Sequence, residues 1–231
     1  MKMKEITSTI GNLLKDFDTS REDKQRLLQI IHNTIEFNKK LVWSNDEKNV
    51  SLATTPEVLI EIYKLRSQVY SKLNYDKEFP DSIKGLNFDS YDEHSAIVYT
   101  KSNKRITGTC RVIFDSDKKL PMDKNFSLDY LRDKKKRLAE LSRLMITSET
   151  KGLSQEPKLL TQSAYMVMKK NESTTLMSVM VHEHFKLYDR FGGFNIEGEL
   201  KNYGNLSTPF IITSWEVARI SPFFKKAFLA A

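Results

Sequence analysis

The chain has 231 residues, 39% of them hydrophobic and 29% charged, which is typical of one large folded domain or one domain with an appendage. No apolar run approaches the length of a bilayer span, the first residues lack the apolar core of a signal peptide, and a single cysteine excludes an internal disulfide, so we expect a cytoplasmic protein. The net charge of +7 favours a nucleic acid, an anionic membrane or an acidic protein as partner and does not choose among them.

Residues 1–50 are predicted to form a helical extension before a main domain at 51–231. Ile6, Ile10 and Leu13 recur at helical spacing, and a second helix with one apolar stripe begins near Ser20. Both helices are amphipathic, so we expect them to pack on the main domain. The polar run at residues 44–49 is predicted to be the linker between the two parts.

The main domain is predicted to open with a helix that carries an arginine on its apolar stripe. Thr55 and Pro56 form a typical helix start, and the helix runs to about Tyr70. Arg66 lies on the stripe that faces the core. Because a charge on a buried face needs a counter-charge, Arg66 is the first candidate partner for Glu140, in a later strand.

Two strands are predicted after a turn-rich loop at residues 71–91. The loop ends with Asp89 and Asp92, for which surface turn residues are the alternative interpretation. The strands cover 95–100 and 106–114, and the second carries Arg111 in its middle.

The most unusual element is the predicted strand Leu138–Ile146, because it carries three polar side chains inside an apolar run: Glu140, Ser142 and Arg143. Side chains alternate along a strand, so Glu140 and Ser142 are expected on one face and Arg143 on the other. Burying a carboxylate and a guanidinium is costly unless they are paired. The strand therefore belongs either to a structural ion-pair network or to the lining of a cleft.

The rest of the chain is predicted to alternate helices and strands. Helices are expected at 159–168 and 182–191, strands at 174–181, 194–203 and 209–217, and a short terminal helix from Ser221. This order predicts an α/β fold with a mixed sheet and crossover helices, and neither a barrel nor a doubly wound parallel sheet.

Six ionisable residues fall inside predicted strands, on the inner face of a helix or just before a strand: Arg66, Asp89, Asp92, Arg111, Glu140 and Arg143. With them the sequence resembles the acyl-homoserine-lactone synthases and the long-chain N-acyl amino acid synthases, which share the GNAT acyltransferase fold. The resemblance spans about residues 55–215 and rests on these motifs: Tyr63-Lys64-Leu65-Arg66, Asp89-x-x-Asp92, Gly108-Thr109-Cys110-Arg111 and Ala139-Glu140-Leu141-Ser142-Arg143-Leu144. The later Leu120-Pro121 favours the N-acyl amino acid side of the family.

The resemblance implies a GNAT-like three-layer fold, with a mixed, mostly antiparallel sheet flanked by helices, and an N-acyltransferase activity. The implied reaction is direct attack of an amine on an acyl thioester, and the implied catalytic residues are Glu140, Ser142 and Arg143, with Glu140 as the base. In GNAT folds the strand of Glu140 splays from the next strand, here 174–181, and the pantetheine arm of the donor lies in the gap.

The resemblance also implies two groups of substrate-binding residues. A charged cluster either holds the charged end of the acceptor or fixes the loop before Asp89, and its members are Arg66, Asp89, Asp92, Arg111 and Arg143. Backbone amides near Leu144, Met145 and Ile146 are expected to stabilise the thioester oxyanion. Met145, Met177 and Met180 are assigned to the lining of an acyl tunnel, although core packing is the favoured role for any single one of them.

No bound cofactor is implied, and the donor is expected to be a phosphopantetheine-linked acyl group. CoA-dependent GNAT enzymes carry a Gln/Arg-x-x-Gly-x-Gly/Ala loop after the catalytic strand, whereas residues 147–153 contain only Gly152. This difference favours acyl carrier protein over acyl-CoA. The acidic carrier is expected to bind the densest basic cluster, which consists of Lys134, Lys135, Lys136 and Arg137.

Other interpretations stay open. The acceptor is an amino acid or a similar small amine in one interpretation and S-adenosylmethionine in the other, which describes an autoinducer synthase of quorum sensing. A non-enzymatic interpretation is a basic module that binds nucleic acid or a membrane surface, but it leaves Glu140 without a role. No metal site is expected, because His182 and His184 lack the spacing of a helical zinc pair, and Cys110 is expected to be a core residue.

Overall fold

A computed structural model describes residues 3–15, 17, 19–43, 49–147, 155–201, 206 and 208–229. Its strands are β1 (Val50–Leu52), β2 (Ser95–Ser102), β3 (Arg105–Phe114), β4 (Leu138–Ile146), β5 (Thr175–Met180), β6 (Phe194–Leu200) and β7 (Phe210–Glu216). Its longer helices are α1 (Met3–Leu13), α2 (Arg21–Lys40), α3 (Pro56–Lys72), α5 (Gln155–Lys170) and α6 (His182–Asp189). Its short helical turns are η1 (Ser90–His94), η2 (Pro121–Lys124), α4 (Asp129–Asp133), η3 (Val217–Arg219), α7 (Pro222–Phe224) and η4 (Lys225–Leu229).

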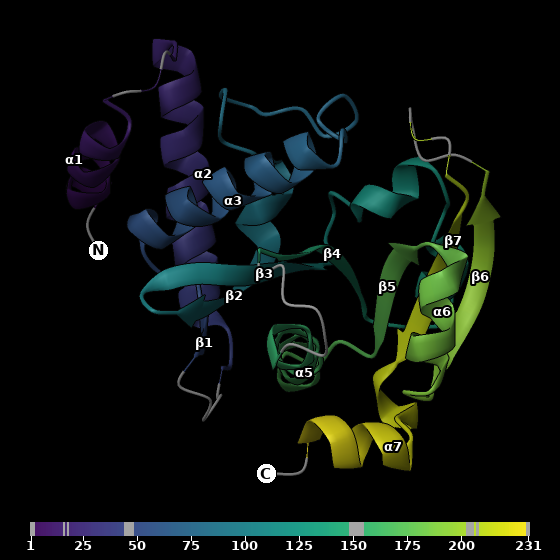
Figure 1. Cartoon of the computed structure of the whole chain (residues 1–231). Helices are drawn as coiled ribbons and strands as arrows, with labels where there is room; N and C mark the ends of the chain where they lie inside the picture. The colour runs from purple at the N-terminus through teal and green to yellow at the C-terminus, as the bar shows by residue number, and fades with distance from the viewer. Residues whose placement is uncertain are drawn as a thin grey trace.

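The seven strands form one sheet in the order β1-β2-β3-β4-β5-β7-β6. Only the pair β4–β5 is parallel, and the other neighbouring pairs of this sheet are antiparallel. Helices α1, α2 and α3 lie on one side of the sheet and α5 lies on the other, which makes three layers (Figure 1). The predicted GNAT-like architecture is therefore confirmed, with β1 as an additional edge strand that was not predicted.

The two N-terminal helices pack on α3. Ser20 begins α2 by accepting a hydrogen bond from the Asp23 N–H at 3.0 Å. Ile10 and Ile31 are fully buried in one hydrophobic cluster with Leu59 of α3. The predicted helices are confirmed, whereas the division at residue 50 stays a prediction. Residues 44–48 of the predicted linker lie outside the described residues.

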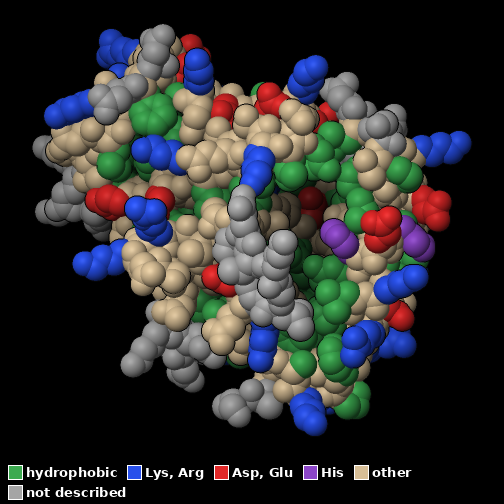
Figure 2. Space-filling model, in the orientation of Figure 1, with side chains coloured by type: hydrophobic (Ala, Val, Ile, Leu, Met, Phe, Trp, Pro, Cys, Tyr) green, Lys and Arg blue, Asp and Glu red, His purple; other side chains and the backbone are tan. Residues whose placement is uncertain are grey.

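Strands β4 and β5 are paired over a short stretch only. Leu138 pairs with Thr175 and Glu140 pairs with Met177, where the parallel register ends. On the other side of β4, the pairing with β3 continues to Ile146. Figure 2 shows a hollow between β4 and the β5–α6 segment, lined largely by hydrophobic side chains. The predicted splay is therefore present, and it begins directly after Glu140.

None of the helices in the described part of the chain is long and apolar enough to cross a bilayer. The segment that carries η2 and α4 packs over the sheet beside α3, where Met122 and Leu131 share a hydrophobic cluster with Met177 of β5 and Ile212 of β7. The Met122 N–H of this segment donates to Glu140 Oε2 at 2.9 Å, so the segment contacts Glu140 directly.

Candidate active site

The middle of β4 contains a β-bulge. Thr109 of β3 pairs with Met145 and Arg111 pairs with Ser142, so two β4 residues stand opposite one residue of β3. Arg143 in the bulge has a φ of +54°, which non-glycine residues rarely adopt. The predicted alternation of faces is therefore wrong here, because the bulge turns Arg143 to the side of Ser142, where both contact the same ion-pair network.

Five of the six predicted ionisable residues form this network. Arg66 Nη1 donates to both carboxylate oxygens of Asp92, at 2.9 and 3.1 Å. Arg111 Nη1 donates to Asp89 Oδ1 at 2.7 Å and to Asp92 Oδ1 at 3.0 Å. Arg143 Nη2 donates to Asp89 Oδ2 at 2.7 Å. The side chains of Arg66 and Asp92 have no exposed surface, so their charges neutralise each other in the interior.

The predicted pairing of Arg66 with Glu140 is wrong, because Asp92 occupies the Arg66 guanidinium instead. Asp92 reaches this position through a reciprocal cap of η1. Asp92 Oδ2 accepts from the Asp89 N–H at 3.1 Å, while Asp89 Oδ1 accepts from the Tyr91 N–H at 2.9 Å. The three-residue spacing of the two aspartates therefore places both carboxylates in one turn before β2.

Asp89 is the accessible member of the network, with 31% of its side chain exposed. Burial by itself would raise the pKa of Asp89, but the charges of Arg111 and Arg143 hold it well below its usual range. Arg143 also donates to Asn87 Oδ1 and lies over the ring of Tyr70, with 5.6 Å between its Cζ and the ring centroid. These contacts join the loop before Asp89 to β4.

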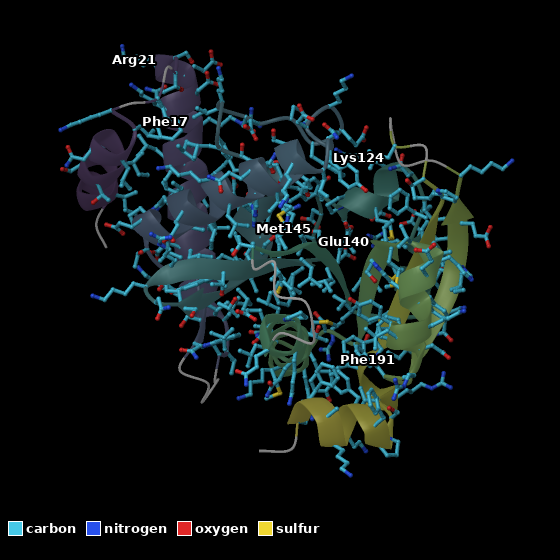
Figure 3. All side chains as sticks on the ribbon, in the orientation of Figure 1. Phe17, Arg21, Lys124, Glu140, Met145 and Phe191 are labelled. Carbon is cyan, nitrogen blue, oxygen red and sulfur yellow. The ribbon has the colours of Figure 1, made fainter. Side chains whose placement is uncertain are left out.

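Glu140 lies on β4 near the centre of the molecule (Figure 3), and among the described residues it forms no ion pair with an arginine. It is 5% exposed, and its Oε2 accepts a hydrogen bond from the Met122 N–H at 2.9 Å. Burial raises the pKa of Glu140 to about 7. The Met122 N–H and the charge of Arg111 oppose this rise, whereas the negative charges of Asp123 and Asp89 reinforce it. A carboxyl group of this kind is poised to exchange a proton at neutral pH.

The residues predicted to stabilise the oxyanion or to line the tunnel lie on two strands that separate after Glu140. Met177 and Met180 are on β5, whereas Leu144, Met145 and Ile146 are on β4. Met177 is fully buried beside Glu140, and Met180 is half-buried at the end of β5. Met145 is 6% exposed and packs in the cluster of α3. Leu144 and Ile146 are half-buried and pack against the cluster that contains α5. Met145 therefore occupies the core position that was the alternative interpretation for the methionines.

The structure shows two contacts of the site that the sequence does not predict, one made by Asn87 and one by the Met122 N–H. Asn87 is buried, accepts from Arg143 and donates to the Phe79 carbonyl oxygen at 2.8 Å. Its position between two apolar residues, just before Asp89, was the available signal. The Met122 N–H is a backbone group and has no sequence signature, although Leu120-Pro121 marks its segment.

The buried Cys110 thiol is unsuited to nucleophilic catalysis. Burial raises the pKa of the Cys110 thiol to about 12, so the thiol is not ionised at neutral pH. Within the described ranges, no group of three or more His, Cys, Asp or Glu side chains could hold a metal ion.

Asp92→Asn should lower the free energy of unfolding by about 3–5 kcal/mol, because it leaves two buried guanidinium groups without their shared counter-charge. Urea unfolding measures this change. Glu36→Gln is the matched control, since it removes one partner of an exposed pair with Lys39 at 3.1 Å and should shift the midpoint far less. Equal shifts in the two variants would show that the network does not stabilise the fold.

Comparison with known proteins relates this geometry to a family. The chain matches the N-acyl amino acid synthase FeeM family over residues 61–215. It is similar to the structure of FeeM, an N-acyl amino acid synthase from uncultured soil microbes, with 20% identity over 78% of this chain and 93% of that chain and a TM-score of 0.62. The acyl-homoserine-lactone synthase LasI matches with the same identity and coverage and a TM-score of 0.58.

A CoA-dependent acyl-homoserine lactone synthase, MesI, is 14% identical over 76% of this chain and 89% of that chain, with a TM-score of 0.55. The comparison with curated proteins gives no match. The solved structures confirm the fold, and the family match spans more than half of the chain, including the whole charged network and Glu140. The chain therefore belongs to the FeeM N-acyl amino acid synthase family and is an N-acyltransferase.

Proposed function

We propose that the protein moves a fatty acyl group from an acyl carrier protein thioester to the amino group of an amino acid or a similar small amine. The observation that carries this proposal is the place of Glu140. A buried carboxyl group with a pKa of about 7 lies on β4 at the point where β5 separates from it. An amine must lose a proton to attack a thioester, and Glu140 is suited to accept that proton.

In the proposed reaction the amine nitrogen attacks the thioester carbonyl carbon. A C–N bond forms, the C–S bond breaks, and the amine proton passes to Glu140. Glu140 then gives this proton to the departing sulfur, which becomes the free pantetheine thiol, and the carboxylate is regenerated. Beyond Glu140 the register with β5 has ended, so backbone N–H groups of residues 141–146 that point to that side have no β5 partner. Such groups can donate to the developing oxyanion.

The charged network supports the proposal in two different ways. Asp89 is partly exposed and is the member that we assign to the acceptor, whose ammonium group complements a carboxylate. Arg66, Asp92 and Arg111 are buried, so we assign them to positioning Asp89. Ser142 Oγ accepts from Arg111 Nε at 3.0 Å and thereby links the network to the strand of Glu140.

The donor must enter where β4 and β5 are apart. The basic cluster at residues 134–137 directly precedes Leu138, at the end of β4 where the two strands are still paired. Two of its cations already contact carboxylates: Lys136 Nζ lies 3.5 Å from Glu216, and Arg137 Nη1 lies 2.8 Å from Glu172. A carrier bound there would face the closed end of the gap.

We therefore propose that the acidic carrier binds at the open end. Helix α6 follows β5 directly, and α5 begins on the side where β4 ends, because the β4–α5–β5 connection joins two parallel strands. Lys186 of α6 and Lys158 in the first turns of α5 are exposed. Two cations beside the entrance would attract an acidic protein to it.

Glu140→Gln should lower kcat/KM by about 10²–10⁴-fold, because the variant has no base for the amine proton. In the parent enzyme kcat/KM should rise as the pH rises, with a midpoint near pH 7, because only the ionised carboxylate of Glu140 accepts a proton. Above pH 7 the variant should be at least as stable as the parent, because it no longer ionises a buried group. The exposed Glu199→Gln is the control, and a Glu140→Gln enzyme as active as the parent would refute the mechanism.

Incubation with acyl carrier protein or CoA thioesters and with amino acids or S-adenosylmethionine, followed by mass analysis, identifies donor and acceptor. We expect an N-acyl amino acid formed from the carrier thioester.

Lys186→Glu should raise KM for that donor about threefold to tenfold and leave KM for a short pantetheine thioester unchanged, because only the carrier bears the acidic surface. If Lys134→Glu has the larger effect, the carrier binds the cluster at residues 134–137 instead.

A further inference from the structure

We propose that Arg132 is a positioning residue for Glu140: by bridging Asp115 and Asp123 it holds the loop whose Met122 N–H contacts the Glu140 carboxylate. We call these three residues the Arg132 bridge. The inference rests on the proposed role of Glu140 as the base. It assigns a function to charged residues that lie outside the family motifs and outside the Arg66–Asp92–Arg111 network.

The Arg132 bridge joins two carboxylates through one guanidinium group. Arg132 Nε and Nη2 donate to the two oxygens of Asp115 at 2.7 and 2.9 Å. Arg132 Nη1 and Nη2 donate to the two oxygens of Asp123 at 2.8 and 2.6 Å. Arg132 Nη1 also donates to Asp129 at 3.0 Å. Two-pronged guanidinium–carboxylate contacts fix direction as well as distance, so this geometry is rigid.

Asp123 connects the Arg132 bridge to the backbone of the loop. Its Oδ2 accepts from the Leu120 N–H at 3.0 Å, and its Oδ1 accepts from the Leu128 N–H at 3.1 Å. Met122 lies between these two donors, in the turn that Asp123 closes from both ends. Although burial would raise the pKa of Asp123, its bonds to Arg132 and to the two N–H groups lower it, so Asp123 is charged at neutral pH.

Asp115 ties the other end of the bridge to the sheet. It directly follows β3, and its N–H donates to the Leu138 carbonyl oxygen at the start of β4 at 3.1 Å. Arg132 therefore connects the loop of Met122 to the pair of strands that carries Arg111 and Glu140. The distance between the Met122 N–H and the carboxylate depends on this connection.

The other charged or titratable groups that act on Glu140 come from three elements. Arg111 lies on β3, Asp123 in η2, and Asp89 and Tyr91 at the start of η1. The hydrogen bonds of Arg132 go to Asp115, Asp123 and Asp129, so its effect on Glu140 passes through the loop. Because a hydrogen bond from an N–H stabilises the ionised carboxylate, loosening the loop should raise the pKa of Glu140 above about 7.

Arg132→Met tests the proposal through the pH dependence of acyl transfer, measured as kcat/KM relative to the parent at each pH so that ionisation of the acceptor amine cancels. The midpoint should rise by about one pH unit, which makes the variant about tenfold slower at pH 6 and nearly equal to the parent at pH 9. Arg132→Lys keeps the charge but not the two-pronged geometry, so its midpoint should rise by less. Lys119→Met removes a neighbouring cation that contacts Asp129 and not Asp123, and should leave the midpoint unchanged.

A midpoint equal to or below that of the parent in the folded Arg132 variants would overturn the proposal, as would a loss of the same size at every pH. If Arg132→Met does not fold, Arg132→Lys alone decides the question. Glu140→Gln separates this proposal from the proposed function. An inactive Glu140→Gln together with unshifted Arg132 variants refutes the bridge alone, whereas an active Glu140→Gln refutes the base itself.

Discussion

The burial of the Glu140 carboxyl group against one backbone N–H is the interaction on which the proposed chemistry of this protein depends. Asp89 belongs to the same site, yet two arginines keep it charged, whereas Glu140 has no arginine within hydrogen-bonding distance among the described residues and its pKa rises to about 7. Two carboxyl groups in one site therefore have opposite pKa shifts. One is suited to a permanent charge and the other to moving a proton.

This arrangement lowers stability in a defined pH range. The pKa of Glu140 is higher in the folded than in the unfolded protein, so its contribution to stability falls as the pH rises from the unfolded value to about 7. Asp89 acts in the opposite sense, because its lowered pKa makes its ion pairs stabilising above the unfolded value. The buried pair of Arg66 and Asp92 anchors the turn that carries Asp89, so the network offsets part of the cost of Glu140.

The sequence predicts most of the helices and strands and the five ionisable residues of the buried network, but not the contacts that these residues make. The apolar run with its three polar residues predicted β4 with its observed bounds, and the stripe of α3 predicted that Arg66 is buried. Helical periodicity shows that the Arg66 side chain faces the core, but it does not show which carboxylate pairs with the Arg66 guanidinium. The sequence therefore suggests Glu140 as the partner, whereas the structure shows Asp92. Strict alternation failed at Arg143, because a bulge with positive φ has no signature in a run of non-glycine residues.

The most direct test of Glu140 as the base is a crystal structure with an N-acyl amino acid product bound. If Glu140 is the base, the acyl chain should lie in the gap between β4 and β5, and the amide nitrogen should lie within hydrogen-bonding distance of the Glu140 carboxyl group, directly or through one water. A product bound elsewhere, with its amide nitrogen beyond the reach of one water from Glu140, would contradict the assignment of Glu140 as the base.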